Sequence, residues 1–368
     1  MRNISINKLL CKMTSILLRV IPKKKKKAIF IGYPDYDDML RGLLPHIKDL
    51  KLTVLVDNKK KPPFWVNNYR VKILKKKSLS GFFSLLSAEI VFFTHGIYSF
   101  YPTPTEKRQK IINLWHGMPL KNIGYLDRKN NVPGSHYTIA TSVFFSKIMA
   151  EAFNIPRENV LICGLPRNDI LFLETKNPYL LTLKKEYNKI VCWMPTYRHS
   201  QKGDFRFDGE PNKITEQCIN ELNLFFHKNN SLLVLKPHPM DMINYNFHSL
   251  SNIKIITNEI LDGWQTTVYE LLSITDALWT DYSSVFIDYI VTKKPIIFIT
   301  QDLTSYKKSR GFTYPIINHP LPGKQFTTIE GILQHSFDSL FDNNEQYLDI
   351  YHDDNKFRHS ILDDVINR

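Results

Sequence analysis

The stretch Thr280–Ile299, TDYSSVFIDYIVTKKPIIFI, decides the predicted fold. Its apolar residues predict the end of a short strand at 276–279, a helix over 282–291 and an all-apolar second strand over 295–299. Such a strand–loop–helix–strand unit is typical of a parallel sheet covered by helices. The polar residues 280–284 therefore fall at the carboxyl end of a strand and the amino end of a helix.

Two interpretations of these polar residues stay open on this stretch alone. In the first, Asp281, Ser283 or Ser284 is simply an N-cap that accepts a backbone hydrogen bond. In the second, the unpaired N–H groups and the dipole of the helix attract an anion. Further polar groups converging on the same edge of the sheet would favour the second.

Short apolar runs of the same kind recur in two series, separated by a change of pattern near residues 175–188. We therefore predict an α/β fold of two doubly wound, Rossmann-like domains, residues 28–180 and 181–368, facing one another across a cleft. We expect the acidic, helical end of the chain to belong to the second domain. The expected strands are 28–33, 52–57, 69–74, 89–95, 110–117, 136–142, 159–164, 190–198, 231–239, 253–258, 277–283 and 295–300.

Composition limits the classes of protein. A chain of 368 residues is long enough for two domains, and its four cysteines are scattered without a C-x-x-C pair. This pattern argues against a disulfide framework or a zinc site and favours a reducing compartment. P-loop, strand-linked G-x-G-x-x-G and H-E-x-x-H motifs do not occur, so we expect neither a cofactor nor a metal.

The net charge of +14 is concentrated at the amino-terminal end. Residues 1–80 hold 20 Lys and Arg against 5 Asp and Glu, whereas the remaining chain is close to neutral. The chain has no nucleic-acid motif and no basic stripe interleaved with aromatic residues, so we expect no nucleic-acid partner.

Residues 1–27 predict a basic amphipathic segment that lies on an anionic membrane. Charged residues interrupt its apolar run and no small-residue cleavage site follows, so a signal peptide is a poor fit. No later segment offers ~20 uninterrupted apolar residues. We therefore expect a peripheral protein on the cytoplasmic face of the cell membrane. The apolar face consists of Leu9, Met13, Ile16, Leu17 and Val20, and the basic residues are Lys8, Lys12, Arg19 and Lys23–Lys27.

Four polar clusters follow predicted strands: His116 with Gly117, Arg198, Lys236 with His238, and residues 280–284. Together they provide cations, histidines, hydroxyls and a helix amino terminus, which is the equipment for binding a diphosphate. Phosphoryl transfer depends mostly on positioning and on neutralising charge. A histidine suits the task of taking the proton from an attacking hydroxyl, and His116 is our candidate. We interpret the ten histidines other than His116 and His238, including His95, as structural.

In this order, the clusters resemble the CDP-glycerol glycerophosphotransferase family, which builds teichoic acids and related poly(polyol phosphate) or capsule polymers. The resemblance implies a GT-B-type fold and a length similar to that of the short, primase-like members. The chain departs from the family pattern at Met118, where a Thr is common, and at residues 313–316, which lack an expected acidic residue. The matching motifs are LWHGMPLKNIGY (114–125), GLPRNDIL (164–171), MPTYR (194–198), KPHP (236–239), TDYSSVFIDYIVTKKPIIF (280–298) and DLTSYKKSRGF (302–312).

Position by position, the resemblance implies catalytic roles for His116 and His238, His116 being the base at the acceptor hydroxyl. It also implies that Lys236 and His238 contact the donor diphosphate, that Arg198 lies close by and that Arg310 closes over the site. The remaining residues expected to bind or position the donor are Gly117, Thr280, Asp281, Ser283 and Ser284.

We expect an enzyme that transfers a polyol phosphate from CDP-glycerol or CDP-ribitol to a hydroxyl of a lipid-linked saccharide or growing polymer, releasing CMP. Glycerol phosphate is the favoured group. Two alternatives remain at this point: a GT-B glycosyltransferase that uses a nucleotide sugar, because fold does not determine function, and a non-catalytic protein that binds membranes or anionic polymers through residues 1–80.

Overall fold

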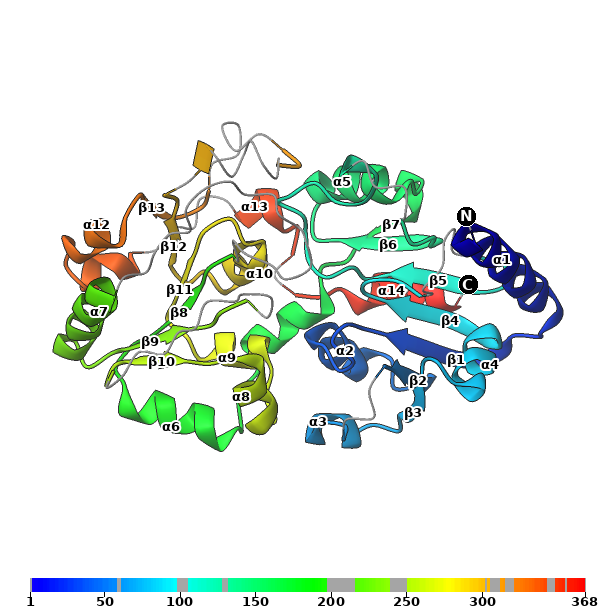
Figure 1. Ribbon diagram of the computed structural model, residues 1–368, viewed down its shortest axis with the longest axis horizontal. Coiled ribbons are helices and arrows are strands. Elements are labelled where there is room, and N and C mark those ends of the chain that lie inside the picture. Colours follow the sequence, from blue (N-terminus) through cyan, green and yellow to red (C-terminus); the bar gives the residue numbers. More distant parts are fainter. Residues whose placement is uncertain are drawn as a thin grey trace. The chain divides into compact units, whose positions relative to one another are not determined.

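The chain forms two compact units in a computed structural model (Figure 1). The first unit consists of Met1–Met118, Ile123–Ile170 and Asp349–Arg368, and the second of Pro119–Asn122 and Leu171–Leu348. The structure describes residues 2–57, 61–97, 105–127, 132–196, 216–238, 250–301, 303–304, 312–314, 321–342, 348–354 and 356–367.

The first unit is built on a seven-stranded sheet with the order β3-β2-β1-β4-β5-β6-β7. All its pairs are parallel, and in the register Ile29 of β1 lies between Thr53 of β2 and Val91 of β4. The central strands are buried on both faces, as in a sheet covered by helices. The strands are β1 (Lys24–Ile31), β2 (Lys51–Val56), β3 (Lys72–Lys75), β4 (Ala88–Phe93), β5 (Lys110–Asn113), β6 (Tyr137–Ala140) and β7 (Val160–Ile162).

The second unit is built on a six-stranded sheet with the order β10-β9-β8-β11-β12-β13, again parallel throughout. In each sheet the first strand of the series, β1 or β8, lies in the interior. The next two strands add on one side of it and the later strands add on the other side, which is the doubly wound arrangement. The strands are β8 (Ile190–Met194), β9 (Leu232–Leu235), β10 (Ile253–Ile255), β11 (Ala277–Thr280), β12 (Ile296–Ile299) and β13 (Lys324–Phe326).

Helices connect the strands of both sheets (Figure 1). In the first unit they are α1 (Arg2–Val20), α2 (Asp38–Leu43), α3 (Phe64–Asn67), α4 (Leu79–Leu86), α5 (Val143–Phe153), α13 (Leu348–Tyr351, whose first residue groups with the second unit) and α14 (His359–Asn367). In the second unit they are α6 (Pro178–Glu186), α7 (Glu216–Lys228), α8 (Asn258–Gly263), α9 (Val268–Ser273), α10 (Val285–Tyr289) and α12 (Ile329–Leu333).

Every strand expected from the apolar runs overlaps an observed strand, and the α/β prediction is confirmed. The mixed sequence of β13, KQF, gave no signal because only a continuous or alternating apolar run predicts a strand. The helix of the opening stretch is shorter than expected: α10 ends at Tyr289 and a 3₁₀ turn, Ile290–Thr292, follows it.

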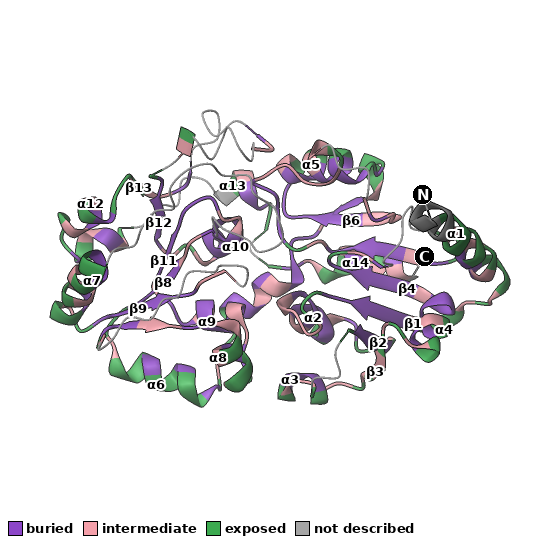
Figure 2. Ribbon diagram, in the orientation of Figure 1, coloured by how far each residue is buried: buried purple, intermediate pink, exposed green. Residues whose placement is uncertain are grey.

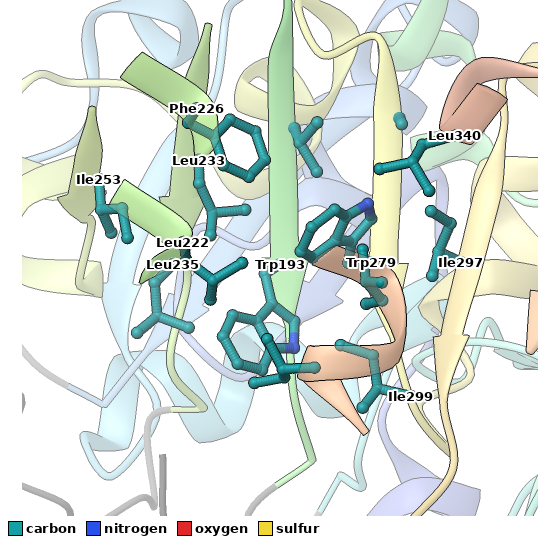
Figure 3. Packing of buried hydrophobic residues seen from close by; sticks show 14 of the residues in the cluster. Trp193, Leu222, Phe226, Leu233, Leu235, Ile253, Trp279, Ile297, Ile299 and Leu340 are labelled. Atoms are coloured by element: carbon teal, nitrogen blue, oxygen red, sulfur yellow. The ribbon is translucent and has the colours of Figure 1, made fainter. Parts of the chain in front are cut away.

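Aliphatic side chains surround Trp193, Phe226 and Trp279 in the core of the second unit (Figure 3). Trp193 of β8 and Trp279 of β11 are register partners, and their ring centroids lie 6.5 Å apart. Phe226 of α7 packs against Trp279 at 5.6 Å. Burial of each such side chain contributes about 1.5–3 kcal/mol, so these contacts hold α7 on the face of the sheet between β8 and β11.

The grouping of residues 349–368 differs from the expected ranges, because these residues belong to the first unit rather than to a domain over 181–368. Thr141 Oγ1 donates to the Tyr351 carbonyl at 2.6 Å, and the N–H of Phe357 donates to Asp169 at 2.9 Å. Figure 1 accordingly marks both ends of the chain beside the first sheet. Long-range bonds of this kind leave no pattern in the local sequence.

The amino-terminal segment also differs from expectation, because α1 and Lys24–Lys27 are part of the first unit. Thr14 and Leu18 are buried, and Lys23 donates to the carbonyls of Leu18 and Leu86. Lys24–Lys27 begin β1 rather than forming a separate basic run. None of the described helices is both long enough and apolar enough to cross a bilayer.

Candidate active site

A tight turn after β5 presents His116. The Asn113 side chain accepts a hydrogen bond from the backbone N–H of Trp115 at 2.9 Å, and Trp115 has a φ of +51°. Gly117 follows with a φ of +127°, a conformation that is strained for any residue with a Cβ. The backbone of this turn therefore requires a glycine at position 117, in addition to the role in donor binding that we expect for Gly117. The turn leaves the His116 side chain exposed to solvent.

A backbone hydrogen bond selects the tautomer of His116. Its Nδ1 lies 3.3 Å from the carbonyl oxygen of Thr94, the residue that follows β4. A carbonyl oxygen can only accept, so Nδ1 carries the proton and Nε2 keeps its lone pair. This is the protonation state that a general base requires.

A second histidine lies against the first. The ring centroids of His95 and His116 are 4.2 Å apart, and the two planes differ by 11°. Trp115 packs beside His116 with a centroid distance of 4.1 Å and makes an edge contact with Phe153 of α5. The structure thus brings His95, which the sequence reading treated as structural, into contact with the candidate base.

Both histidines are neutral at pH 7. The surrounding protein lowers the pKa of His116, first by desolvation and then through the charges of His95 and Arg167, while the bond with Thr94 opposes the shift. The pKa of His95 is also lowered, by desolvation and then by the charges of Arg167 and Lys76. Both side chains are exposed to solvent, which limits the desolvation, but the direction of each shift keeps the rings unprotonated.

Arg167 is a further residue that the sequence reading did not select, although it lies in the quoted motif GLPRNDIL. It belongs to the 3₁₀ segment Pro166–Phe172, and its charge acts on the pKa values of His95, His116 and Asp37. A guanidinium beside the base favours an anionic reactant there.

In the second unit, Lys236 follows β9 and its side chain is only 3% exposed. Its backbone N–H donates to the carbonyl of Trp193 in β8, and its ammonium group donates to the carbonyl of Pro237 at 3.1 Å. Within the described part of the chain, its ammonium group makes no ion pair with a carboxylate. Desolvation lowers the pKa of Lys236. A buried cation with donors to spare is suited to an anionic ligand.

His238 lies two residues further on and is half-buried. Desolvation and the charges of Lys121 and Lys236 lower the pKa of His238 to about 4. Lys121 belongs to the short segment Pro119–Asn122, which groups with the second unit because Leu120 accepts a hydrogen bond from the N–H of Thr313. The two lysines make this edge of the second sheet electropositive, and Lys121 was not among the predicted site residues.

Thr280 and Asp281 connect β11 to β8. The buried Thr280 hydroxyl donates to the carbonyl of Met194 at 2.8 Å. The Asp281 carboxylate accepts from the backbone N–H of Thr196 at 3.0 and 3.1 Å and from its hydroxyl at 2.7 Å. These bonds give both residues a structural role at the carboxyl end of β8, and their expected contact with the donor stays a prediction.

Ser283 and Ser284 remain available at the start of α10, where both are half-buried. Ser284 occupies the N-cap position, but its hydroxyl makes no capping hydrogen bond. Ser283 Oγ accepts weakly from the N–H of Val285 at 3.4 Å. The simple N-cap interpretation therefore does not account for these hydroxyls.

Arg198 and Arg310 lie outside the described residues. Across the part of the chain that the structure describes, no group of three or more His, Cys, Asp or Glu side chains could hold a metal ion.

Two Rossmann-like units, one presenting a histidine and the other a buried lysine at the carboxyl ends of parallel strands, define a GT-B-type fold. The chain belongs to the family described as CDP-Glycerol:Poly(glycerophosphate) glycerophosphotransferase, whose model matches residues 12–359. The family membership that the sequence motifs predicted is thereby confirmed.

Two of the relatives are polymerases of teichoic acids. A teichoic acid poly(glycerol phosphate) polymerase of Bacillus spizizenii is 26% identical over 364 residues, which covers 89% of this chain and 87% of the relative. The teichoic acid ribitol-phosphate polymerase TarK of Staphylococcus aureus is 28% identical over 338 residues, covering 85% of this chain and 59% of the relative.

A solved structure of the wall teichoic acid polymerase TagF has the same fold, with a TM-score of 0.72 and 20% identity over 96% of this chain and 92% of that chain. At this identity, the likeness supports the GT-B-type architecture and does not assign the roles of single residues.

Proposed function

We propose that this protein transfers glycerol phosphate from CDP-glycerol to a hydroxyl of a lipid-linked saccharide or of a growing polymer. The acceptor oxygen forms a bond to the β-phosphorus, the bond from that phosphorus to the bridging oxygen breaks, and CMP leaves with the bridging oxygen. The proton of the acceptor hydroxyl goes to the protein. The observation that carries this proposal is the fixed tautomer of His116 in a member of the glycerophosphotransferase family.

In the first unit, Nε2 of His116 receives the acceptor proton. Its lone pair is free because the Thr94 carbonyl holds the proton of the ring on Nδ1. The lowered pKa keeps the ring in the basic form at neutral pH. Arg167 adds a positive charge beside the pair of histidines and favours the anionic substrate.

In the second unit, Lys236 and His238 bind the donor diphosphate. Lys236 has two donors left after its bond to Pro237. Ser283 and Ser284 add hydroxyl donors at the start of α10, and Arg198 and Arg310 complete the positive charge. Asp281 contributes indirectly, because its bonds to Thr196 fix the end of β8.

The acceptor of such an enzyme is carried by a lipid, and α1 supplies a matching surface. Leu9, Met13, Ile16 and Val20 are 52–72% exposed and share one face of the helix. Lys8, Lys12 and Arg19 are exposed along its flank. Figure 2 shows most of the described part of α1 as exposed. An apolar stripe edged by cations suits the headgroup region of an anionic bilayer. We therefore place the protein peripherally on the cytoplasmic face of the membrane.

The test is CMP release by the purified protein with CDP-glycerol and, separately, CDP-ribitol, with a synthetic undecaprenyl-like disaccharide diphosphate as acceptor. We expect acceptor-dependent release with CDP-glycerol and at least a hundredfold lower kcat in His116→Ala, since a positioned base contributes about 10²–10⁴-fold. His335→Ala is the matched control, because His335 is also exposed and also bonds a backbone carbonyl through Nδ1, at 3.0 Å.

Acceptor-dependent CMP release only with CDP-ribitol would show that the transferred polyol is ribitol, and the proposed reaction would stand. Near-normal turnover in folded His116→Ala would overturn the assigned base. Transfer of a sugar without phosphate in the new linkage would overturn the reaction itself.

A further inference from the structure

Thr94 lies at the centre of a hydrogen-bond network behind the candidate base. Its side chain is completely buried. Its hydroxyl donates to Oδ2 of Asp37 at 3.1 Å, accepts from the backbone N–H of Tyr33 at 3.3 Å and lies 2.9 Å from Nδ1 of His95. Its carbonyl oxygen accepts from Nδ1 of His116. One residue therefore holds both stacked histidines.

The number of available protons determines which nitrogen of the His95 ring is protonated. A threonine hydroxyl has one proton, and Thr94 gives it to the Asp37 carboxylate. The bond between Thr94 Oγ1 and His95 must then use the proton on Nδ1 of His95. Both stacked rings consequently carry their proton on Nδ1 and leave Nε2 unprotonated.

Asp37 is itself held in place, because its Oδ1 accepts from the N–H of Leu40 at 2.9 Å as the N-cap of α2. Gly42 in the same helix packs against the backbone at Pro166 and Arg167 so closely that a Cβ would lie 2.1 Å from the Pro166 carbonyl oxygen. The network is thus anchored on α2 and on the segment that carries Arg167.

We propose that Thr94 is a positioning residue that acts, together with Asp37 and His95, to hold the imidazole of His116 in one tautomer and one ring orientation. This role rests on the proposed function of His116 as the base. His95 packs on one face of the His116 ring, and its own ring is fixed by the bond to Thr94. Rotation of the His116 ring would therefore break both the stack and the carbonyl bond.

The charged and titratable groups around the pair include Asp37 and Asp38 at the start of α2, Arg167 on the 3₁₀ segment and Lys76 after β3. Tyr33 packs edge-on against the His95 ring at 5.6 Å. Burial raises the pKa of Asp37 to about 7, so its carboxylate is ionised at pH 8. The tautomers are therefore measured at pH 8, where Thr94 must donate to Asp37.

The first experiment uses ¹⁵N NMR of the histidine rings in the full chain, without donor or acceptor. We expect Nδ1–H tautomers for both His95 and His116 in the wild-type protein. We expect Thr94→Val to give mixed tautomers at His95 and Thr94→Ser, which keeps the hydroxyl, to restore the wild-type signals. An Nε2–H tautomer at His116 in the wild-type protein would overturn the proposal.

The second experiment measures CMP release by the same variants. A displacement of about 1 Å can cost as much as a hundredfold in rate, so we expect Thr94→Val to lower kcat about tenfold to a hundredfold with the donor KM unchanged. Thr94→Ser should retain most of the activity. Equal kcat in Thr94→Val and the wild-type protein would overturn the positioning role.

Two substitutions at the exposed His95 avoid the risk that a buried Thr94 variant fails to fold. His95→Asn keeps a donor for Thr94 Oγ1 but removes the stacked ring, whereas His95→Phe keeps a ring and removes the donor. We expect both to lower kcat with little effect on the donor KM, and unchanged kcat in both would overturn the proposal. Expected tautomers without turnover in the wild-type protein would instead contradict the proposed function alone, because the NMR measurement needs no substrate.

Discussion

The carbonyl oxygen of Thr94 lies 3.3 Å from Nδ1 of His116, although 22 residues separate them in the chain. The register of the first sheet produces this approach. Phe93 at the end of β4 is the partner of Asn113 at the end of β5, and the N–H of Leu114 donates to the Phe93 carbonyl at 2.9 Å. The turns that follow the two strands therefore meet at one edge of the sheet, where ligands bind in open α/β sheets.

The pH dependence of turnover follows from this neutral histidine pair. The base must be unprotonated, and its pKa is lowered from 6.5. We therefore expect the fall in kcat/KM that protonation of His116 causes to lie below pH 6.5, separate from the titration of Asp37 in the supporting network near pH 7. Substitution of His95 by Ala removes one cause of the lowered pKa, so the fall should begin at higher pH. Asp37→Asn removes the titration of Asp37, so an acidic midpoint above pH 6.5 in this variant would contradict the assignment.

Lys236 provides a separate test of the donor site. Its burial makes the charged form costly, as the lowered pKa indicates, so Lys236→Met should leave the free energy of unfolding at pH 7 unchanged or increase it. Loss of a charge-assisted hydrogen bond, worth about 1.5–3 kcal/mol, should raise the donor KM at least tenfold. Lys185→Met on the exposed face of α6 is the control. An unchanged donor KM in Lys236→Met would remove Lys236 from the site.

Substitution of Asp281 distinguishes a structural role of this residue from a role in donor binding. Asp281 accepts three hydrogen bonds from Thr196, so Asp281→Asn should lower the free energy of unfolding by about 1–3 kcal/mol in urea denaturation. The loss should be smaller in a Thr196→Val background, because the hydroxyl partner is already absent. A raised donor KM with unchanged stability would instead favour direct contact between Asp281 and the donor.

The sequence was sufficient where local patterns determine structure, and insufficient where distant residues meet. Apolar runs located the expected strands, and motifs located His116, Lys236 and His238. His95 was treated as structural because a lone histidine usually is, yet it lies just after β4 as His116 lies just after β5. The adjacency of β4 and β5 in the sheet was the missing information. The lysines of β1 were similarly read as a basic arm, because charged residues rarely signal a strand.

Close packing between α2 and the segment that carries Arg167 predicts that a larger residue at Gly42 destabilises the protein. A Cβ at Gly42 would lie 2.1 Å from the Pro166 carbonyl oxygen, so Gly42→Ala must displace backbone and should cost about 1–3 kcal/mol of stability. Gly263 near the end of α8 has nothing within 4 Å of the added atom. Gly263→Ala should therefore be neutral or stabilising by up to about 1 kcal/mol. Thermal unfolding of both variants checks the contrast, and equal melting temperatures would contradict it.

The exposed stripe of α1 predicts membrane association that one charge can disrupt. Ile16 is 54% exposed on the face opposite the buried Leu18, so Ile16→Glu should preserve folding while it places a carboxylate against anionic headgroups. We expect at least tenfold weaker sedimentation with vesicles that contain phosphatidylglycerol, and unchanged turnover with a soluble acceptor.

Leu224 on α7 of the second unit is the matched control for this substitution, because it is 57% exposed and also lies on a helix. Leu224→Glu carries the same change of charge and of apolar area, so it should sediment like the wild-type protein. Equal weakening by the two substitutions would mean that net charge, rather than the face of α1, governs association. Unchanged sedimentation of Ile16→Glu would remove α1 from the membrane contact altogether.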